Sequence, residues 1–271
     1  MEGGKKIVAC FLLLLFGATA FSQDVYFVTM VKGNIKRTNG TPVKVGDKFP
    51  ITEKLIFPKQ DNKLILLHPQ KGRFLLTPGT AKSEPSGEYL VYLKNSLLPS
   101  SERIKLSTRG EGGPEDFFTV NSAVNRNILF IGETAISLGN TIYNISDPKN
   151  DFFFIQYSPF AGKTVSNALK VRNDSLILNR RDFYFSNEER PDSAQFMIGF
   201  NRSSEYKKVS QIGSVFRPVF MSVEDCRAMM ITIVQAIGKN KEKVLEEAMT
   251  VLCYNTGKTD KNVLVKLYDS L

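Results

Sequence analysis

The chain has 271 residues, of which 42% are hydrophobic and 23% are charged, a balance typical of folded globular proteins rather than of disordered chains. Its formal net charge of +9 is uneven, because residues 23–113 carry 15 Lys or Arg against 8 Asp or Glu, while the later residues are nearly balanced. With one histidine and three cysteines, the chain has little material for an ordinary zinc site, and we expect neither a metal nor a cofactor.

Residues 1–22 have the pattern of a secretory signal peptide. Two lysines precede an apolar run over residues 7–16, and the small residues Ala20 and Ser22 stand at positions −3 and −1 of a cut before Gln23. The run is about half as long as a membrane-spanning helix, so we expect no transmembrane segment in the mature chain. The sequence therefore predicts cleavage between Ser22 and Gln23 and a bacterial protein of the periplasm or the extracellular space.

Residues 23–98 contain short apolar or alternating segments separated by turn residues, which is the pattern of a small β barrel or sandwich. The Asn39-Gly40 pair is a strong signal for a hairpin turn. The predicted strands of this module are Tyr26–Val31, Gly33–Lys36, Lys54–Phe57, Leu64–Leu67, Phe74–Leu76 and Tyr89–Leu93.

A series of turn motifs runs through about residues 30–80 of this module. A glycine-containing opening strand is followed by a Gly-Asp turn, a short step and a glycine turn before a final strand that ends in proline; the segments are 33–35, 43–47, 53–55, 64–67 and 72–79. This order resembles the FecR-like periplasmic domains. The resemblance implies a small all-β module of the cell envelope that contacts a ligand or another protein, and it carries over no signalling role.

The basic residues of this module suit an anionic envelope polymer, such as lipopolysaccharide or a cell-wall polymer, or an acidic envelope protein. Its lysines are spaced singly rather than in clusters, a pattern that also fits an ordinary solvated surface. Nucleic acid is not an expected partner in an exported compartment.

Residues 99–116 contain many Ser, Gly and Pro residues and are predicted to be a linker. Strand patterns resume in residues 117–220 and helical spacing follows in residues 221–271, so we expect an α+β domain over residues 117–271. The predicted fold class is mainly β with a C-terminal α-helical hairpin, that is, an all-β module followed by an α+β domain. The strands expected in the second domain are Ile128–Ile131, Ala135–Leu138, Phe152–Tyr157, Ala168–Val171, Leu176–Leu178, Phe183–Phe185 and Phe196–Phe200.

The last fifty residues predict helices. Ser222 followed by Asp225 is a variant of the capping box, and apolar residues then recur at helical spacing until Gly238. A second helix is expected over about Lys241–Tyr254, and a short third one over Lys261–Tyr268.

Cys226 and Cys253 are the cysteines that remain after removal of the signal peptide. They lie equally far from the centre of the expected helical hairpin, so antiparallel packing of the two helices brings them to the same level. In an oxidising compartment the pair is predicted to form a disulfide, which closes a loop of about 26 residues and stabilises the fold by about 3 kcal/mol.

The remaining motifs give weak support to catalysis. His68 stands at the end of a predicted strand, and Ser204 with Lys207 matches the Ser-x-x-Lys of penicillin-recognising enzymes without their further motifs. The sequence therefore favours a non-catalytic binding or scaffolding protein of the envelope. The alternative is an envelope hydrolase that uses carboxylates or Ser204 of the second domain. A third interpretation places a partner contact on the helix that carries Met229 and Met230.

Overall fold

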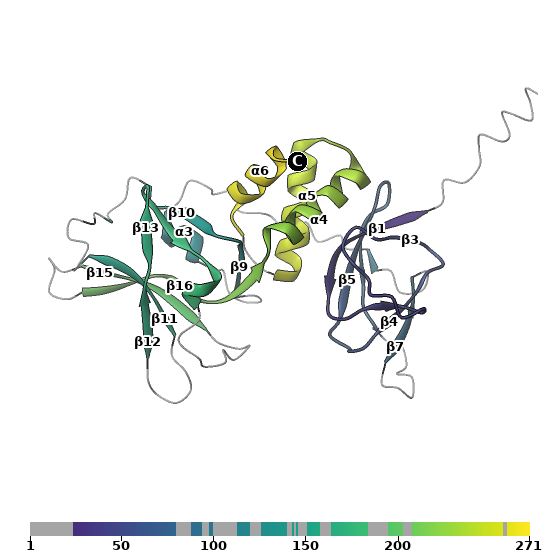
Figure 1. Cartoon of the computed structure of the whole chain (residues 1–271), viewed down its shortest axis with the longest axis horizontal. Coiled ribbons are helices and arrows are strands. Elements are labelled where there is room, and N and C mark those ends of the chain that lie inside the picture. The colour runs from purple at the N-terminus through teal and green to yellow at the C-terminus, as the bar shows by residue number, and fades with distance from the viewer. Residues whose placement is uncertain are drawn as a thin grey trace, which may run out of the picture. The chain divides into compact units, whose positions relative to one another are not determined.

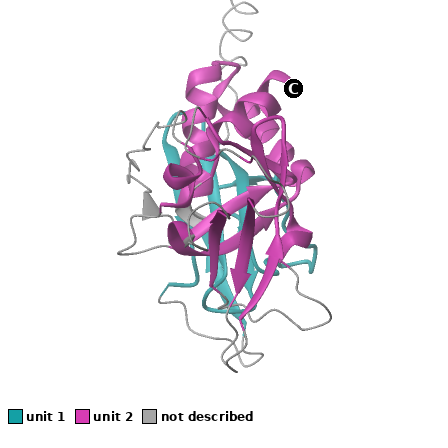
Figure 2. Ribbon diagram, turned by 90° about the vertical axis from the view of Figure 1, so that its left-hand side faces the viewer, with its two compact units in different colours: residues 1–100 teal, residues 101–271 magenta. Residues whose placement is uncertain are grey.

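The computed structural model has two compact units, residues 1–100 and residues 101–271, coloured teal and magenta in Figure 2. The expected signal peptide and its cleavage site between Ser22 and Gln23 lie outside the described residues. The structure describes residues 24–79, 88–93, 98–99, 113–119, 126–139, 143, 145, 151–157, 164–183, 195–202, 208–256 and 259–271.

Unit 1 is built from antiparallel strands in two sheets. A five-stranded sheet has the order β3-β1-β5-β6-β8, and a three-stranded sheet has the order β2-β4-β7. The strands are β1 (Val25–Lys32), β2 (Lys36–Arg37), β3 (Lys48–Pro50), β4 (Lys54–Phe57), β5 (Lys63–His68), β6 (Gly72–Leu76), β7 (Tyr89–Tyr92) and β8 (Leu98–Pro99).

The two sheets of unit 1 share one apolar core. Alternate strand residues contribute to it, as expected for a pleated strand with a buried face, and Tyr26 and Val28 of β1 are 2% and 0% exposed. The predicted turn at Asn39-Gly40 is present, because the backbone N–H of Arg37 donates to the carbonyl of Thr41 at 2.8 Å. The buried residues of this core are Tyr26, Val28, Ile35, Val43, Phe49, Leu55, Phe57, Leu64, Leu66, Phe74, Leu76, Val91 and Leu93.

Unit 2 contains a five-stranded sheet with the order β12-β11-β15-β16-β9 and a three-stranded sheet with the order β10-β14-β13. All the pairings are antiparallel except that of β9 with β16, which is parallel. The elements before the helices are α3 (Pro114–Phe118), β9 (Asn127–Ile131), β10 (Thr134–Ser137), β11 (Phe152–Tyr157), β12 (Val165–Ala168), β13 (Lys170–Arg172), β14 (Ser175–Leu178), the 3₁₀ helix η1 (Arg180–Phe183), β15 (Phe196–Arg202) and β16 (Lys208–Met221).

Phenylalanine dominates the core of unit 2. Seven phenylalanines belong to it, each at most 4% exposed, and their rings pack edge to face or tilted, which is the favourable arrangement for aromatic pairs. The helix α3 lies close to an irregular part of β16, where the pairing with β15 shifts register, Gly213 has φ +66° and a Cβ would stand 2.5 Å from the carbonyl carbon of Phe118. The phenylalanines are Phe118, Phe130, Phe153, Phe183, Phe196, Phe200 and Phe216.

Three helices end the chain and group together beside β9 (Figure 1). They are α4 (Val223–Ile237), α5 (Lys241–Thr256) and α6 (Lys261–Asp269). The predicted cap of α4 is confirmed, because the Ser222 hydroxyl accepts from the Asp225 N–H at 3.0 Å and donates to its carboxylate at 2.7 Å. Thr259, between α5 and α6, donates a buried hydrogen bond of 3.3 Å to the Leu129 carbonyl of β9, which ties the helices to the sheet.

The predicted fold class is confirmed, since the chain is mainly β and ends in helices. Several local predictions are wrong. Residues 33–35 of the expected strand Gly33–Lys36 lie between β1 and β2, and β3 was not predicted. The segment Ala168–Val171 divides between β12 and β13, Phe183 ends a 3₁₀ helix rather than starting a strand, residues 114–116 of the expected linker belong to α3, and β16 had no counterpart in the prediction. Asn173 and Asp174 form the turn between β13 and β14, and both have positive φ.

Candidate functional site

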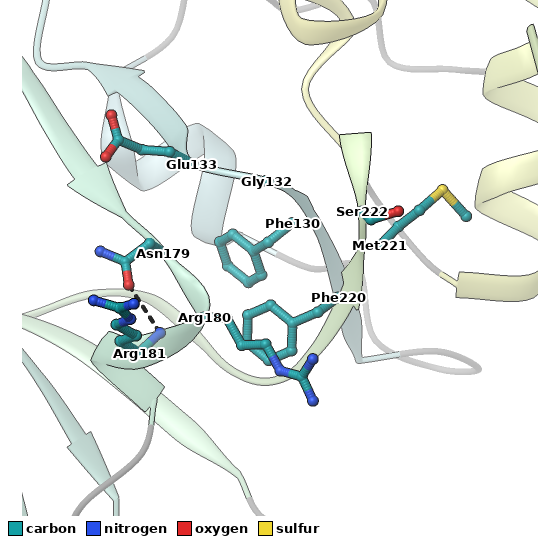
Figure 3. Close-up of a pocket in the computed structure, with 9 residues that line it drawn as sticks. All are labelled: Phe130, Gly132, Glu133, Asn179, Arg180, Arg181, Phe220, Met221 and Ser222. Carbon is teal, nitrogen blue, oxygen red and sulfur yellow. Dashed lines mark hydrogen bonds between the residues drawn. The ribbon is translucent and has the colours of Figure 1, made fainter. Parts of the chain in front are cut away.

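A pocket of about 500 Å³ lies in unit 2 where three segments meet (Figure 3). The turn between β9 and β10 forms one side, η1 forms the second, and the junction of β16 with α4 forms the third. Its lining residues are Phe130, Gly132, Glu133, Asn179, Arg180, Arg181, Phe220, Met221 and Ser222.

Aromatic rings form the apolar centre of the pocket. Phe130 and Phe220 are register partners on the parallel strands β9 and β16, and their rings stack at 5.8 Å between centroids with an interplanar angle of 29°. Phe183 packs behind both, at 5.1 Å from each ring. Because Phe130 is fully buried and Phe183 is 1% exposed, these two rings are fixed by the core of unit 2.

The helix η1 is held by local hydrogen bonds between side chains and backbone. The Asn179 N–H donates to the Asp182 carboxylate at 2.7 Å, and the Arg181 N–H donates to the Asn179 side-chain oxygen at 2.8 Å. Asn and Asp commonly form such bonds at turns. Together with the buried ring of Phe183, they fix the backbone from which Arg180 and Arg181 project.

Two exposed guanidinium groups edge the pocket on the η1 side. Arg180 extends beneath the ring of Phe220, with its Cζ at 6.0 Å from the ring centroid, and Arg181 lies beside Asn179 (Figure 3). A distance of 6.0 Å is at the outer limit of a cation–π contact, so the contact orients Arg180 without holding it tightly.

Glu133 lies at the opposite edge of the pocket and is paired with a residue outside it. Its Oε1 is 2.5 Å from the guanidinium Nη2 of Arg172, and both side chains are more than half exposed. An exposed pair of this kind is screened by solvent and contributes little to stability. Its effect at the pocket is to offset the negative charge of Glu133.

The third side of the pocket has a close approach between two backbones. Gly132 has φ +61° and donates its N–H to the Met221 carbonyl at 3.1 Å, while a Cβ at Gly132 would stand 2.7 Å from Cγ2 of Val223. This position therefore requires glycine. Ser222 is engaged as the cap of α4, so its hydroxyl already has a donor and an acceptor.

The residues that the sequence singled out do not gather at this pocket. His68 is 5% exposed in unit 1, where its Nδ1 accepts from the N–H groups of Gln70 and Lys71 and its Nε2 is 3.4 Å from Asp24. This geometry gives His68 a structural part in the β5–β6 turn. Ser204 lies outside the described residues.

The other candidates lie on the helices of unit 2. Cys226 of α4 and Cys253 of α5 are not bonded to each other in the structure, and burial raises the pKa of the Cys226 thiol to about 12. Met229 and Met230 are core residues, 1% and 0% exposed, so the expected partner contact does not involve these two side chains. Sequence reasoning missed Arg180 and Arg181, whose one signal was a pair of arginines one residue after the end of an apolar strand.

Within the described residues, no three His, Cys, Asp or Glu side chains are placed to hold a metal ion together. No helix in the described part of the chain is both long and apolar enough to cross a membrane. Comparisons of the chain with protein-family models, with curated proteins and with solved structures gave no match.

Proposed function

We propose that this chain is an exported, non-catalytic binding protein of the bacterial cell envelope and that the pocket of unit 2 is its ligand site. The observation that carries the proposal is the combination of a stacked aromatic centre, Phe130 and Phe220, with guanidinium groups at its edge. Ligand sites are typically concave and mainly apolar, with a few polar groups that orient the ligand, and they commonly span 300–1,000 Å³. The pocket, at about 500 Å³, falls within this range.

The rigidity of the pocket supports a binding role. Phe183 joins the apolar centre to η1, so the aromatic rings and the backbone that carries Arg180 and Arg181 are held in one arrangement before a ligand arrives. A preformed site avoids much of the entropy cost of ordering side chains on binding. The polar side chains of Asn179 and Ser222 at the pocket are already engaged in structural hydrogen bonds. This engagement favours a binding role over a catalytic one.

A binding screen with the mature protein tests the proposal. The screen uses small apolar acids, amides, amines and alcohols, with ligand-observed NMR as the readout. We expect saturable binding of at least one class, lost in Phe220→Ala and kept in Phe152→Ala, since Phe152 is also a partly buried strand phenylalanine but does not line the pocket. The proposal fails if no class binds, if Phe220→Ala binds like the wild type, or if any compound is turned over.

The expected export has its own test. Expression of the full chain in a bacterial host, followed by mass spectrometry of the periplasmic fraction, should give a protein that begins at Gln23. An intact chain that stays in the cytoplasm would contradict the envelope assignment.

A second function, contact with an anionic envelope partner, is favoured by one pair of residues in unit 1. Lys32 of β1 and Lys63 of β5 are direct cross-strand partners, and like charges placed opposite each other are unfavourable unless an anion lies between them. This placement agrees with the resemblance of unit 1 to FecR-like domains, which implies a contacting module. We propose that this pair contacts phosphate or carboxylate groups of an envelope polymer.

Co-sedimentation with lipopolysaccharide tests this second function. We expect binding that weakens with rising salt and is lost in Lys32→Glu/Lys63→Glu, while Lys54→Glu, whose ammonium lies over the Tyr92 ring at 4.9 Å, retains most of it. Equal loss in both variants would point to a general effect of net charge and remove the assignment to this pair.

A further inference from the structure

The charges at the unit 2 pocket are unequal. Its lining contains two guanidinium groups, those of Arg180 and Arg181, and one carboxylate, that of Glu133, which leaves a net charge of +1. Because Glu133 is paired with Arg172, its charge is directed away from a ligand in the pocket. The cationic groups therefore decide which ligand charge is favoured.

The two kinds of surface in the pocket are also separated in space. Figure 3 shows the rings of Phe130 and Phe220 at the centre, with the Arg180 guanidinium beneath the Phe220 ring and the Arg181 side chain on the other side of η1, beside Asn179. A ligand with an apolar body against Phe220 thus places one end, and not its whole length, against the Arg180 guanidinium. This arrangement calls for an amphipathic molecule with its charge at one end.

From these observations we infer that the pocket binds an apolar monocarboxylic acid, with its ring or acyl body against the partly buried Phe220, which stacks on the fully buried Phe130, and its carboxylate at Arg180, with Arg181 adding positive charge nearby. The inference rests on the proposed function and adds the ligand class. A carboxylate matches the planar fork of a guanidinium, and charge-assisted hydrogen bonds of this kind are among the stronger ones in proteins.

Arg180 has a specific part in this recognition. In the unliganded protein its guanidinium lies 6.0 Å from the Phe220 centroid, at the outer limit of a cation–π contact. A carboxylate beside Phe220 would lie close to this guanidinium and could pair with it through a charge-assisted hydrogen bond. Arg181, whose backbone is fixed by Asn179, supplies the second positive charge.

A series of ligands that share one body and differ in charge tests the inference on the mature protein. The probes are phenylbutyrate, its neutral amide phenylbutyramide, the cation phenylbutylamine and the ester phenylbutyl phosphate, with affinities measured by ligand-observed NMR titration. We expect phenylbutyrate to bind about tenfold more tightly than the amide, which corresponds to one charge-assisted hydrogen bond, and the amine to bind more weakly than the amide. The preference for the acid should fall as salt is raised.

Matched variants assign the preference to the two arginines. In Arg180→Gln/Arg181→Gln the acid and the amide should bind equally, whereas Arg217→Gln, an exposed arginine of β16 that does not line the pocket, should keep the preference. Tighter binding of the phosphate ester than of the acid overturns the assignment to a carboxylate. Equal binding of acid and amide to the wild type, with loss in Phe220→Ala, overturns the ligand class and leaves the proposed function intact. Absence of binding by all four probes overturns both.

Discussion

Phe183 is the residue through which the core of unit 2 determines the geometry of the pocket. Its ring lies 5.1 Å from Phe130, 5.1 Å from Phe220, 5.3 Å from Phe196 and 6.3 Å from Phe216. The substitution Phe183→Leu keeps an apolar side chain of similar size at the end of η1 but removes the planar ring. We predict that it destabilises unit 2 and also weakens ligand binding.

The expected loss of stability follows from two contributions. A swap between large apolar side chains in a core usually costs less than about 1.5 kcal/mol, and each aromatic pair contributes about 0.5–1.5 kcal/mol beyond its buried area. The contributions of aromatic pairs that share one ring to stability do not simply add. We therefore expect a loss of about 2 kcal/mol in the free energy of unfolding of unit 2.

Urea unfolding followed by circular dichroism measures this loss, and the chain has no tryptophan to give a stronger fluorescence signal. With a slope of roughly 2 kcal/mol per M urea, the unit 2 midpoint should fall by about 1 M while that of unit 1 stays unchanged. Two transitions are expected because the two units have separate cores.

The control for this prediction is Phe153→Leu. Phe153 is also fully buried in the unit 2 core and packs on Tyr143 and Phe200 at 5.1 and 4.8 Å, but it does not line or support the pocket. We expect Phe153→Leu to lower the midpoint by a similar amount while leaving phenylbutyrate affinity unchanged, and Phe183→Leu to lower both. If the two variants bind the ligand equally well, the argument that Phe183 positions η1 for binding is refuted.

Three further predictions concern other parts of the chain. The buried hydroxyl of Thr134 has no hydrogen-bond partner among the described residues, so Thr134→Val should leave the free energy of unfolding unchanged or raise it by about 1 kcal/mol. The Thr29 hydroxyl donates to the Ile65 carbonyl, so Thr29→Val should lower the free energy of unfolding by about 1 kcal/mol. The urea midpoints of the two variants test both expectations. A hydrogen bond from Lys71 lowers the pKa of Asp24 below 3.8. The contribution of Asp24 to the stability of unit 1 is therefore present above about pH 4 and lost as the pH falls through the lowered pKa. Asp24→Asn should reduce the urea midpoint of unit 1 more at pH 6 than at pH 2, and an equal reduction at both would contradict this linkage. If Cys226 and Cys253 form the predicted disulfide, protein from an oxidising compartment that is unfolded without a reductant should contain no titratable thiol. In reduced native protein, Cys226 should resist alkylation at pH 8 because burial raises its pKa to about 12.

Local sequence patterns were sufficient for many elements. The apolar run of β11 and the alternating β4 were predicted with their observed bounds, Phe152–Tyr157 and Lys54–Phe57. The start of α4 followed from Ser222 and Asp225, because a capping box acts within one turn of helix. Such features are readable because the residues that cause them are neighbours in the chain.

Other elements escaped prediction for identifiable reasons. The strand β16 contains Gly213 and Pro218, and glycine and proline normally interrupt strands. In the structure Gly213 leaves room for α3, and Pro218 lies opposite Ile128 in the parallel pairing of β16 with β9. Phe183 follows an apolar segment, yet the bonds between Asn179 and Asp182 turn the chain into η1 before it. In the first case a contact distant in the sequence decides the structure, and in the second a bond within one turn overrides the strand pattern.

The pocket could not be predicted from the sequence because its three sides come from segments that are about 45 residues apart in the chain. The parallel pairing of β9 with β16 brings Phe130 beside Phe220, and nothing in either strand encodes its partner. Arg180 and Arg181 have the pattern of an ordinary solvated turn until the structure places them at the edge of an aromatic pocket.

The most direct test of the binding site is a titration of the mature, isotope-labelled protein with phenylbutyrate, followed through the backbone amide signals. The account predicts that the shifts concentrate on the three segments of the pocket, at Gly132 and Glu133, at Arg180 and Arg181, and at Ser222. Shifts centred on Lys32 and Lys63 of unit 1, or an absence of saturable shifts, would contradict the claim that the unit 2 pocket is the ligand site.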